Sequence, residues 1–221
     1  NLGYLYENGM GVPQDYAIAA AWYREAVAQD LGWTMANLGW LLQNGLGTER
    51  DPAEALRLYR GAAERGSVWA MSRLGTLYRD GTDVEADPAE STRWFRQAAQ
   101  AGDAYAQSEM GLAHANGRGV ERDPVEAVRW YRMAADQGQA FGQASLGWHY
   151  WAGEGVERDL AEAVRLYRLA ADQGDRFAQA NLGYAYDNGE GVEQDHAAAL
   201  RYYLLAAEQG DPVAQNNLAY H

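Results

Sequence analysis

The chain has 221 residues and a formal net charge of −13, from 18 basic and 31 acidic side chains, and 48% of its residues are hydrophobic. These values are typical of a folded protein, and the acidic balance argues against nucleic acid as a partner, because binding to phosphates requires Lys and Arg. The lack of cysteine excludes disulfides, thiolate catalysis and cysteine-rich zinc sites, and no apolar run approaches the roughly 20 residues of a membrane-spanning helix.

A Leu-Gly pair, or a close substitute, recurs every 36 residues along the chain. The copies are Leu2-Gly3, Leu38-Gly39, Leu74-Gly75, Met110-Gly111, Leu146-Gly147, Leu182-Gly183 and Leu218-Ala219. No insertion interrupts this spacing, so six full periods fit, with fragments at both ends. A fixed period of this length is typical of repeat architectures, in which each period is one supersecondary unit.

The first predicted helix of each period contains the Leu-Gly pair, as in residues 68–80. Its apolar residues recur at the spacing of one helical face, which is clearest in residues 178–186. We expect this helix to end at an Asn-Gly pair such as Asn188-Gly189, because glycine adopts the left-handed conformation that closes a helix.

A loop of the form Gly-x-Gly-Val follows, and an aspartate then begins the second predicted helix. These aspartates are Asp15, Asp51, Asp87, Asp123, Asp159 and Asp195. Their carboxylates can accept bonds from first-turn N–H groups, and a glutamate three residues later, such as Glu126, can bond back to the capping residue. In the third copy Asp83 replaces a loop glycine, so we expect that loop to open more easily than its counterpart in the fourth copy.

Arginine recurs at two positions of the second predicted helix, represented by Arg129 and Arg132 in the fourth copy. An acidic residue such as Asp136 lies four positions after several of these arginines. The pattern predicts a solvated ridge with ion pairs between residues i and i+4.

Two antiparallel helices per period cannot bury this much apolar surface alone, whereas stacked neighbours can. The sequence therefore predicts an all-α solenoid of antiparallel helix pairs with a 36-residue repeat. We expect one repeat array over residues 1–221. Its units are approximately 2–37, 38–73, 74–109, 110–145, 146–181 and 182–217, with partial units at both ends.

Four features of each period together resemble a known repeat. They are the Leu-Gly-x-x-Tyr of residues 182–186, the Gly-x-Gly-Val loop, the aspartate after it, and the Ala-Ala-x-x-Gly of residues 206–210. In these the chain resembles the Sel-one-like repeat family, which is related to the tetratricopeptide repeat. The resemblance implies a right-handed superhelix whose first helices line the concave face. It also implies a scaffold or adaptor that binds proteins, often in signalling or at the bacterial envelope.

The sequence offers no evident catalytic or metal centre. The four histidines are His114, His149, His196 and His221. The first two occupy columns that hold Tyr, Leu or Ala in other copies, which favours packed structural roles, and the last two are expected to be solvated. None of the five serines lies in a Gly-x-Ser-x-Gly elbow. We therefore predict a non-enzymatic protein with no catalytic residue, metal or cofactor.

Large aromatic residues recur on the side of the first helices that faces away from the expected core. One column is Trp33, Trp69, Tyr105, Phe141 and Phe177, and we expect it to pack between copies. A second column contains Tyr4 and Trp40, and we expect it to be exposed in a groove. Exposed apolar patches mark interaction sites, and Trp and Tyr contribute strongly to binding. The predicted binding residues in the concave groove are Tyr4, Trp40, Phe141, Trp148, Trp151, Phe177, Tyr184 and Asp187.

The sequence thus predicts a protein-interaction scaffold that binds a peptide or a partner helix, of neutral or basic character, in an aromatic-lined groove. The alternatives are a hydrolase acting on cell-wall or lactam substrates, and a structural spacer within a larger protein. We expect no nucleic-acid partner and no membrane span, and we expect the chain to be part of a longer protein. The compartment is open, since both the bacterial envelope or periplasm and the cytoplasm fit the sequence.

Overall fold

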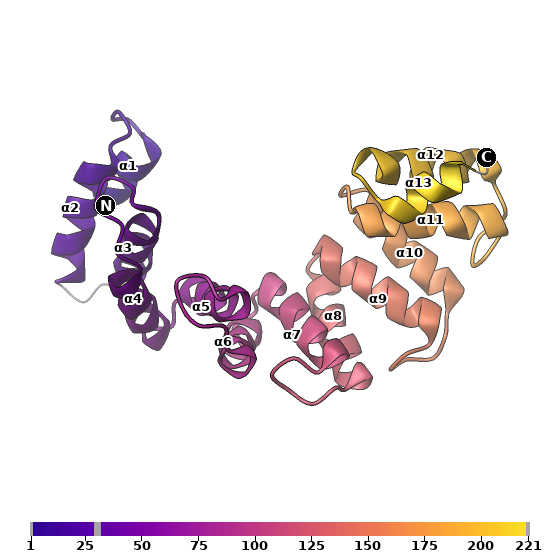
Figure 1. Ribbon diagram of the computed structural model, residues 1–221, viewed down its shortest axis with the longest axis horizontal. Coiled ribbons are helices and arrows are strands. Elements are labelled where there is room, and N and C mark those ends of the chain that lie inside the picture. The colour runs from indigo at the N-terminus through magenta and orange to yellow at the C-terminus, as the bar shows by residue number, and fades with distance from the viewer. Residues whose placement is uncertain (1, 29–31, 220–221) are drawn as a thin grey trace. The chain divides into compact units, whose positions relative to one another are not determined.

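The computed structural model describes residues 2–28 and 32–219, and every regular element in these ranges is an α-helix (Figure 1). His221 therefore lies outside the described residues. The helices are α1 (Leu2–Asn8), α2 (Tyr16–Val27), α3 (Gly32–Asn44), α4 (Pro52–Glu64), α5 (Val68–Asp80), α6 (Pro88–Gln100), α7 (Ala104–Asn116), α8 (Pro124–Asp136), α9 (Ala140–Ala152), α10 (Leu160–Ala171), α11 (Arg176–Asn188), α12 (His196–Glu208) and α13 (Pro212–Leu218).

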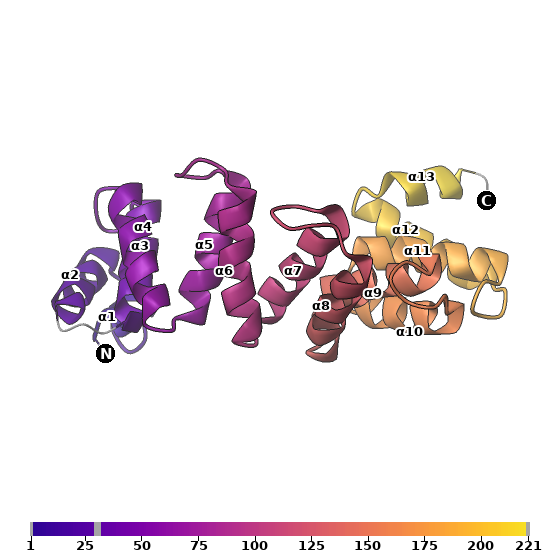
Figure 2. The same cartoon turned by 90° about the horizontal axis from the view of Figure 1, so that it is seen from below.

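The helices pack in chain order within two compact units, residues 1–101 and 102–221, and each unit is described by itself. In the first unit α1 packs on α2, α3 on α4 and α5 on α6, and α2 and α4 also contact the following pair (Figures 1 and 2). The second unit repeats this order from α7 to α13. The all-α stack of helix pairs is confirmed, and the single array over residues 1–221 stays a prediction.

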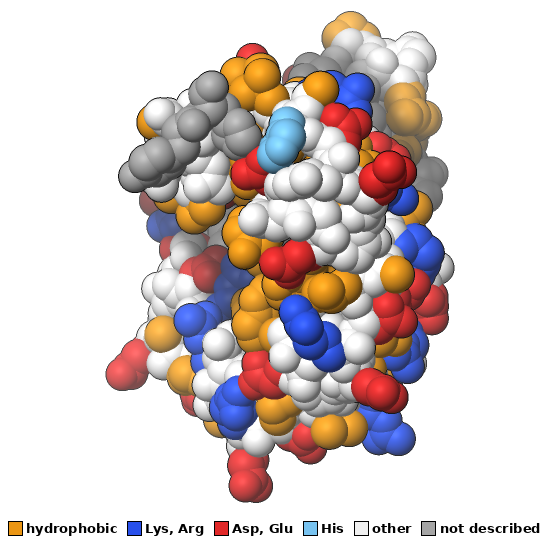
Figure 3. Space-filling view, turned by 90° about the vertical axis from the view of Figure 1, so that its right-hand side faces the viewer, with side chains coloured by type: hydrophobic (Ala, Val, Ile, Leu, Met, Phe, Trp, Pro, Cys, Tyr) orange, Lys and Arg blue, Asp and Glu red, His pale blue; other side chains and the backbone are white. Residues whose placement is uncertain are grey.

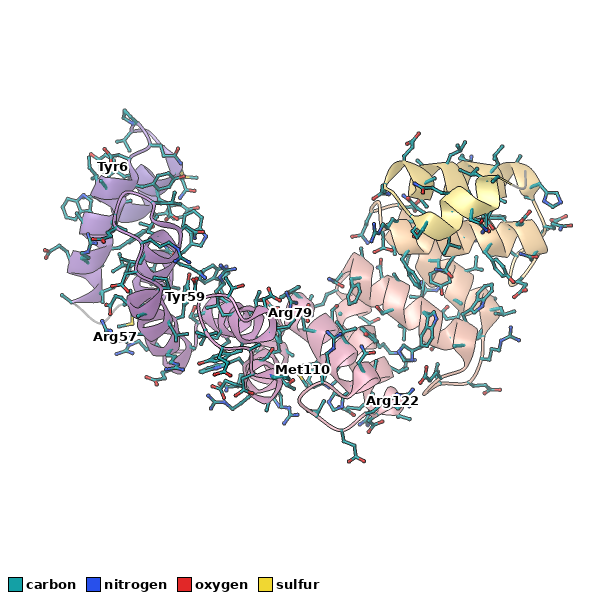
Figure 4. The ribbon with its side chains drawn as sticks, viewed as in Figure 1. Tyr6, Arg57, Tyr59, Arg79, Met110 and Arg122 are labelled. Carbon is teal, nitrogen blue, oxygen red and sulfur yellow. The ribbon has the colours of Figure 1, made fainter. Side chains whose placement is uncertain are left out.

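The glycine of the Leu-Gly pair lies directly against a buried ring of the second helix. A Cβ atom placed on Gly111 would lie 2.6 Å from the ring of Tyr131, and one on Gly75 would lie 2.6 Å from the ring of Phe95. The preceding apolar residue is fully buried, as at Met110 (Figure 4). The motif therefore places one large side chain in the core and makes room for one ring beside it.

All six predicted aspartates cap the second helices, each accepting at least one N–H from the first turn. The predicted return bond from the glutamate is wrong. The N–H of Asp123 donates to the carbonyl oxygen of His114 at 2.9 Å, so it has no need of Glu126. Glu126 pairs instead with Arg129, whose Nη1 is 3.1 Å from Oε2.

The arginine columns also differ from the prediction. Arg57, Arg93, Arg129 and Arg165 pair with the glutamate three residues before them. Figure 4 labels one of them, Arg57, on the same helix as the buried Tyr59. In the other column, Arg132 and Arg168 donate to tyrosine hydroxyls of the following first helix, to Tyr150 at 2.6 Å and to Tyr186 at 2.8 Å. This second column therefore connects neighbouring repeats.

A ladder of glutamine pairs, each with one exposed and one buried member, links repeats in the second unit, and the sequence analysis did not identify it. Nε2 of Gln173 donates to Oε1 of Gln143, and Nε2 of Gln209 donates to Oε1 of Gln179, each at 2.8 Å. The buried amides of Gln143 and Gln179 in turn donate to carbonyl oxygens at the end of the preceding second helix. Each rung satisfies polar groups that would otherwise be costly to bury.

Asp83 is the non-glycine residue with positive φ among the described residues, at 65°. Such a conformation is unfavourable for a residue with a Cβ atom. Its carboxylate accepts a bond from Nε2 of Gln43 at 3.0 Å and pairs with Arg50, and only 12% of the side chain is exposed. These bonds offset the backbone strain, and the easier opening of this loop stays a prediction.

We expect the Asp83 contacts to make stability depend on pH. Burial raises the pKa of Asp83, but the bonds from Gln43 and Arg50 outweigh burial and hold that pKa below its ordinary value. Folding then favours the charged carboxylate. This contribution is complete above the pKa of the unfolded chain, near about 4, and is lost as pH falls through the lower folded-state pKa.

In urea melts, Asp83→Asn should therefore destabilise the chain at about pH 6, and the difference from the parent should shrink as pH falls toward about 3. Glu85→Gln, an exposed change in the same loop, is the control and should leave the midpoint unchanged. A loss of equal size at both pH values would contradict the assignment.

Candidate functional site

A pocket of about 300 Å³ lies on the first helices of the second unit. Its walls come from α7, α9 and the start of α11, with one residue from α8. The lining residues are Leu112, Ala115, Asn116, Tyr131, Phe141, Ala144, Ser145, Trp148, His149, Asp175 and Phe177. Three of the predicted binding residues, Phe141, Trp148 and Phe177, are therefore brought together.

The pocket exists because one column of the repeat holds a small residue here. Ala115 occupies the position that is Gln43, Arg79 and Trp151 in other copies. A long side chain at this position would extend into the volume that the alanine leaves open. Ala144 and Ser145 on α9 add further small groups to the lining.

The floor of the pocket is buried and its rim is exposed. Tyr131 and His149 are both 2% exposed, with ring centroids 5.5 Å apart. Phe141 packs edge-on against Tyr131 at 6.2 Å, and Trp148 against His149 at 5.0 Å. Phe141 and Trp148 nevertheless keep 40% and 39% of their surface exposed. Rings that pack against a buried floor and stay partly exposed are suited to contact a ligand.

The histidine of the pocket has a structural role. Nδ1 of His149 is 2.7 Å from the carbonyl oxygen of Glu154, and because a carbonyl only accepts, Nδ1 carries the proton. This bond ties α9 to the loop after it. Among the described residues, no three His, Cys, Asp or Glu side chains are grouped as a metal ion would require.

Asp175 is the acidic residue of the pocket lining. It caps α11, where its Oδ1 accepts the N–H of Ala178 at 2.8 Å. Burial raises the pKa of Asp175, and this effect exceeds the lowering by the backbone N–H bonds of Ala178 and Phe177 and by the charge of Arg176. The sequence analysis did not select Asp175, although its place two residues before Phe177 could have suggested it.

Three other predicted residues of the second unit lie near one another. The rings of Trp151 and Tyr184 are 5.9 Å apart, and Trp151 also lies 6.3 Å from the buried ring of Tyr167. Tyr184 is exposed, whereas Trp151 is half-buried. Asp187 is bonded to His196, with Oδ1 2.7 Å from Nδ1, so one of its oxygens already has a partner.

The remaining two predicted residues, Tyr4 and Trp40, belong to the first unit. Tyr4 is exposed, and Trp40 is half-buried, 6.5 Å from the ring of Tyr16. Whether any of the eight predicted residues binds a partner stays a prediction.

The sequence analysis expected the first aromatic column, which contains Trp69 and Phe177, to pack between copies. In the structure this packing is incomplete. The rings of the column do contact a buried tyrosine of the preceding second helix, as Trp69 contacts Tyr59 at 5.7 Å and Phe177 contacts Tyr167 at 6.2 Å. Yet Trp69 and Phe177 remain 47% and 44% exposed. Figure 3 shows hydrophobic side chains open to the surface among acidic and basic ones, on the side of the molecule near α12.

Comparison with known proteins accounts for the repeat. Residues 1–31, 34–67, 70–103, 104–139, 140–175 and 176–211 each match the Sel1 repeat. No curated protein matches the chain. No described helix has the length and apolarity needed to cross a membrane.

Several solved structures share the fold. A protective antigen of uropathogenic Escherichia coli strains is 36% identical with a TM-score of 0.92, over 99% of this chain and 47% of that one. This chain thus spans about half the length of that protein. A Sel1 repeat protein from Oxalobacter formigenes is 32% identical with a TM-score of 0.80, over 93% of this chain and 82% of that one. An immunity protein of Pseudomonas aeruginosa, 21% identical with a TM-score of 0.55 over 94% of this chain and 81% of that one, shares the fold alone.

The repeat matches cover nearly the whole sequence, and they agree with the helix pairs, the aspartate caps and the glycine–ring contacts described above. The chain belongs to the Sel1 repeat family.

Proposed function

We propose that this chain is a protein-interaction scaffold that binds a peptide or helix of a partner protein at the pocket on α7, α9 and α11. Sel1 repeats generally serve protein interaction rather than catalysis. The observation that carries the proposal is the set of exposed rings, Phe141, Trp148 and Phe177, around a pocket with a buried floor.

The energetic argument is the burial of these rings. An exposed aromatic side chain gains about 25 cal/mol for each Å² of apolar surface that a partner removes from water. A pocket of about 300 Å³ is at the small end of ligand sites, which suits one or two side chains of a peptide. Trp151, Tyr184 and Asp187 would extend the contact along α9 and α11, and Tyr4 and Trp40 would offer a second surface in the first unit.

The pocket gives little support to the hydrolase alternative. Ser145 and His149 both line it, but Nδ1 of His149 is bonded to the Glu154 carbonyl oxygen and the Ser145 side chain is bonded to Tyr131. Activation of a serine requires a base that takes its proton. Interaction is therefore the function that the pocket geometry favours.

The test is selection of a random peptide library on the intact chain, followed by affinity measurement on the variant Trp148→Ala plus Phe177→Ala. Truncation of central aromatic residues commonly costs 2 kcal/mol or more, so selected peptides should bind this variant at least about thirtyfold more weakly. Trp22→Ala is the matched control, because Trp22 is 45% exposed but lies on α2, and it should not change the affinity.

Two results would contradict the proposal. One is that no peptide is enriched on the intact chain. The other is that the enriched peptides bind the parent and the pocket variant equally.

A further inference from the structure

We infer that the pocket takes an arginine side chain of the partner, held between the rings of Phe141, Trp148 and Phe177 and the carboxylate of Asp175. This inference rests on the proposed function and names the side chain that the pocket selects.

The rings favour a cation. The faces of aromatic rings carry negative potential, and a guanidinium group over a Trp or Phe ring is attracted to it, more strongly where water is excluded. The pocket lining supplies three exposed rings, with the buried ring of Tyr131 behind them. The same rings, with Leu112 and Ala144, give apolar contact for the methylene groups of an arginine side chain.

The charges of the lining residues also favour a cation. Asp175 is acidic, and no Arg is among the lining residues of the pocket. Asn116 uses its Nδ2 to donate to the carbonyl oxygen of Leu112 at 3.0 Å, so its Oδ1 is the atom of that amide that could accept a bond from a ligand. The chain as a whole carries a net charge of −13, which attracts a basic partner at long range.

The state of Asp175 supports this choice of occupant. Its carboxyl loses solvation by burial, which raises its pKa, and the exposed Arg176 beside it does not reverse the shift. A guanidinium in the pocket would stabilise the charged carboxylate that burial disfavours. An apolar occupant would remove still more water from Asp175 and offer nothing in return.

Arginine fits these groups better than lysine. Its guanidinium is planar, so it can stack on a ring and bind a carboxylate through two N–H groups at once. An ammonium group is more strongly hydrated and costs more to bring into an apolar pocket.

The experiment compares four uncharged Gly/Ser peptides that differ at one central position, which is Arg, citrulline, Lys or norleucine. Citrulline matches arginine in shape but is neutral, so the pair isolates the charge. Binding is measured by NMR from the shift of the Trp148 indole N–H signal, which is assigned by its loss in Trp148→Phe. The Arg peptide should bind at least about tenfold more tightly than the citrulline and norleucine peptides, and more tightly than the Lys peptide.

Two variants test whether Asp175 supplies the negative charge that selects arginine. Asp175→Asn should abolish the preference for Arg over citrulline while α11 stays capped, because asparagine is also a good N-cap. Asp211→Asn makes the same change at the cap of α13, outside the pocket, and should leave the preference intact.

Equal binding of the Arg and citrulline peptides would overturn the inference, and so would no shift with any peptide, a preference for Lys, or a preference for Arg that survives Asp175→Asn. Tighter binding of the norleucine peptide, lost in Trp148→Ala, would overturn the inference and still support the proposed function. The library selection decides the proposed function separately, since it imposes no residue on the peptide.

Discussion

Gly75→Ala should lower the free energy of unfolding by about 2 to 3 kcal/mol, because overpacking a filled core costs this much when the neighbours cannot move away. The new Cβ atom would lie 2.6, 2.7 and 2.8 Å from three ring atoms of Phe95. Phe95 is 2% exposed and has little room to withdraw, and Gly75 itself is buried in α5. The midpoint of urea unfolding, followed by circular dichroism, gives the measurement.

Gly61→Ala is the matched control, since Gly61 is also a helical glycine of the first unit, within α4. The nearest atom to its added Cβ would be Sδ of Met35 at 3.3 Å, at the flexible end of a side chain that can shift. Alanine favours a helix over glycine by roughly 1 kcal/mol, so this variant should be as stable as the parent or more stable. The same substitution should therefore destabilise the chain at Gly75 and leave it unchanged or more stable at Gly61.

Phe95→Leu should partly rescue Gly75→Ala, because it removes the ring that the methyl group meets. The double variant should lose less stability than the sum of the two single changes. Additive losses would show that the glycine is needed for some reason other than the ring.

Much of this fold could be predicted from the 36-residue spacing alone. The first helix expected at residues 68–80 is α5, and the six aspartate caps stand where the sequence placed them. These features are local, because a cap or a helix stop depends on residues within one turn. Periodicity then fixes the same register in every copy.

The partners of polar side chains could not be predicted in this way. Glu126 was assigned to its cap, but the N–H of Asp123 is bonded to the His114 carbonyl oxygen, nine residues earlier. Arg132 was assigned to an acid on its own helix, but it reaches Tyr150 on the next one. Both outcomes depend on how helices pack, which the spacing of residues along one helix does not contain.

The candidate site was predictable only in part, because the repeat columns show which residues share a helix face but not how neighbouring helices pack. The columns identified Phe141, Trp148 and Phe177 as aromatic residues on the side of the first helices away from the core, and the structure places all three around one pocket. The small residue that opens this pocket is Ala115. The sequence analysis did not predict a pocket from the column that contains it. A deviation from the repeat toward a smaller residue is the signal that could have located the pocket.

Trp148 and Trp151, three residues apart on α9, differ in burial, and this leads to the last prediction. Trp151 is half-buried against Tyr167, which is fully buried, and against Tyr184, and it packs beside the core cluster around Ala163 and Val164. Trp151→Ala should therefore lower the free energy of unfolding by about 3 kcal/mol, at the lower end of the range for removing a buried aromatic residue.

Trp148→Ala should cost about 1 kcal/mol or less, because Trp148 is 39% exposed and removal of its side chain widens an open pocket rather than creating a closed cavity. The two variants are compared by urea melts at one pH, with peptide affinity measured in parallel. Trp148→Ala should then lose binding while it stays stable, and Trp151→Ala should lose stability first. If both variants melt with the parent, Trp151 is not part of the core. If Trp148→Ala loses several kcal/mol, the pocket rim is itself core, and a loss of binding in that variant could not be assigned to the loss of a contact.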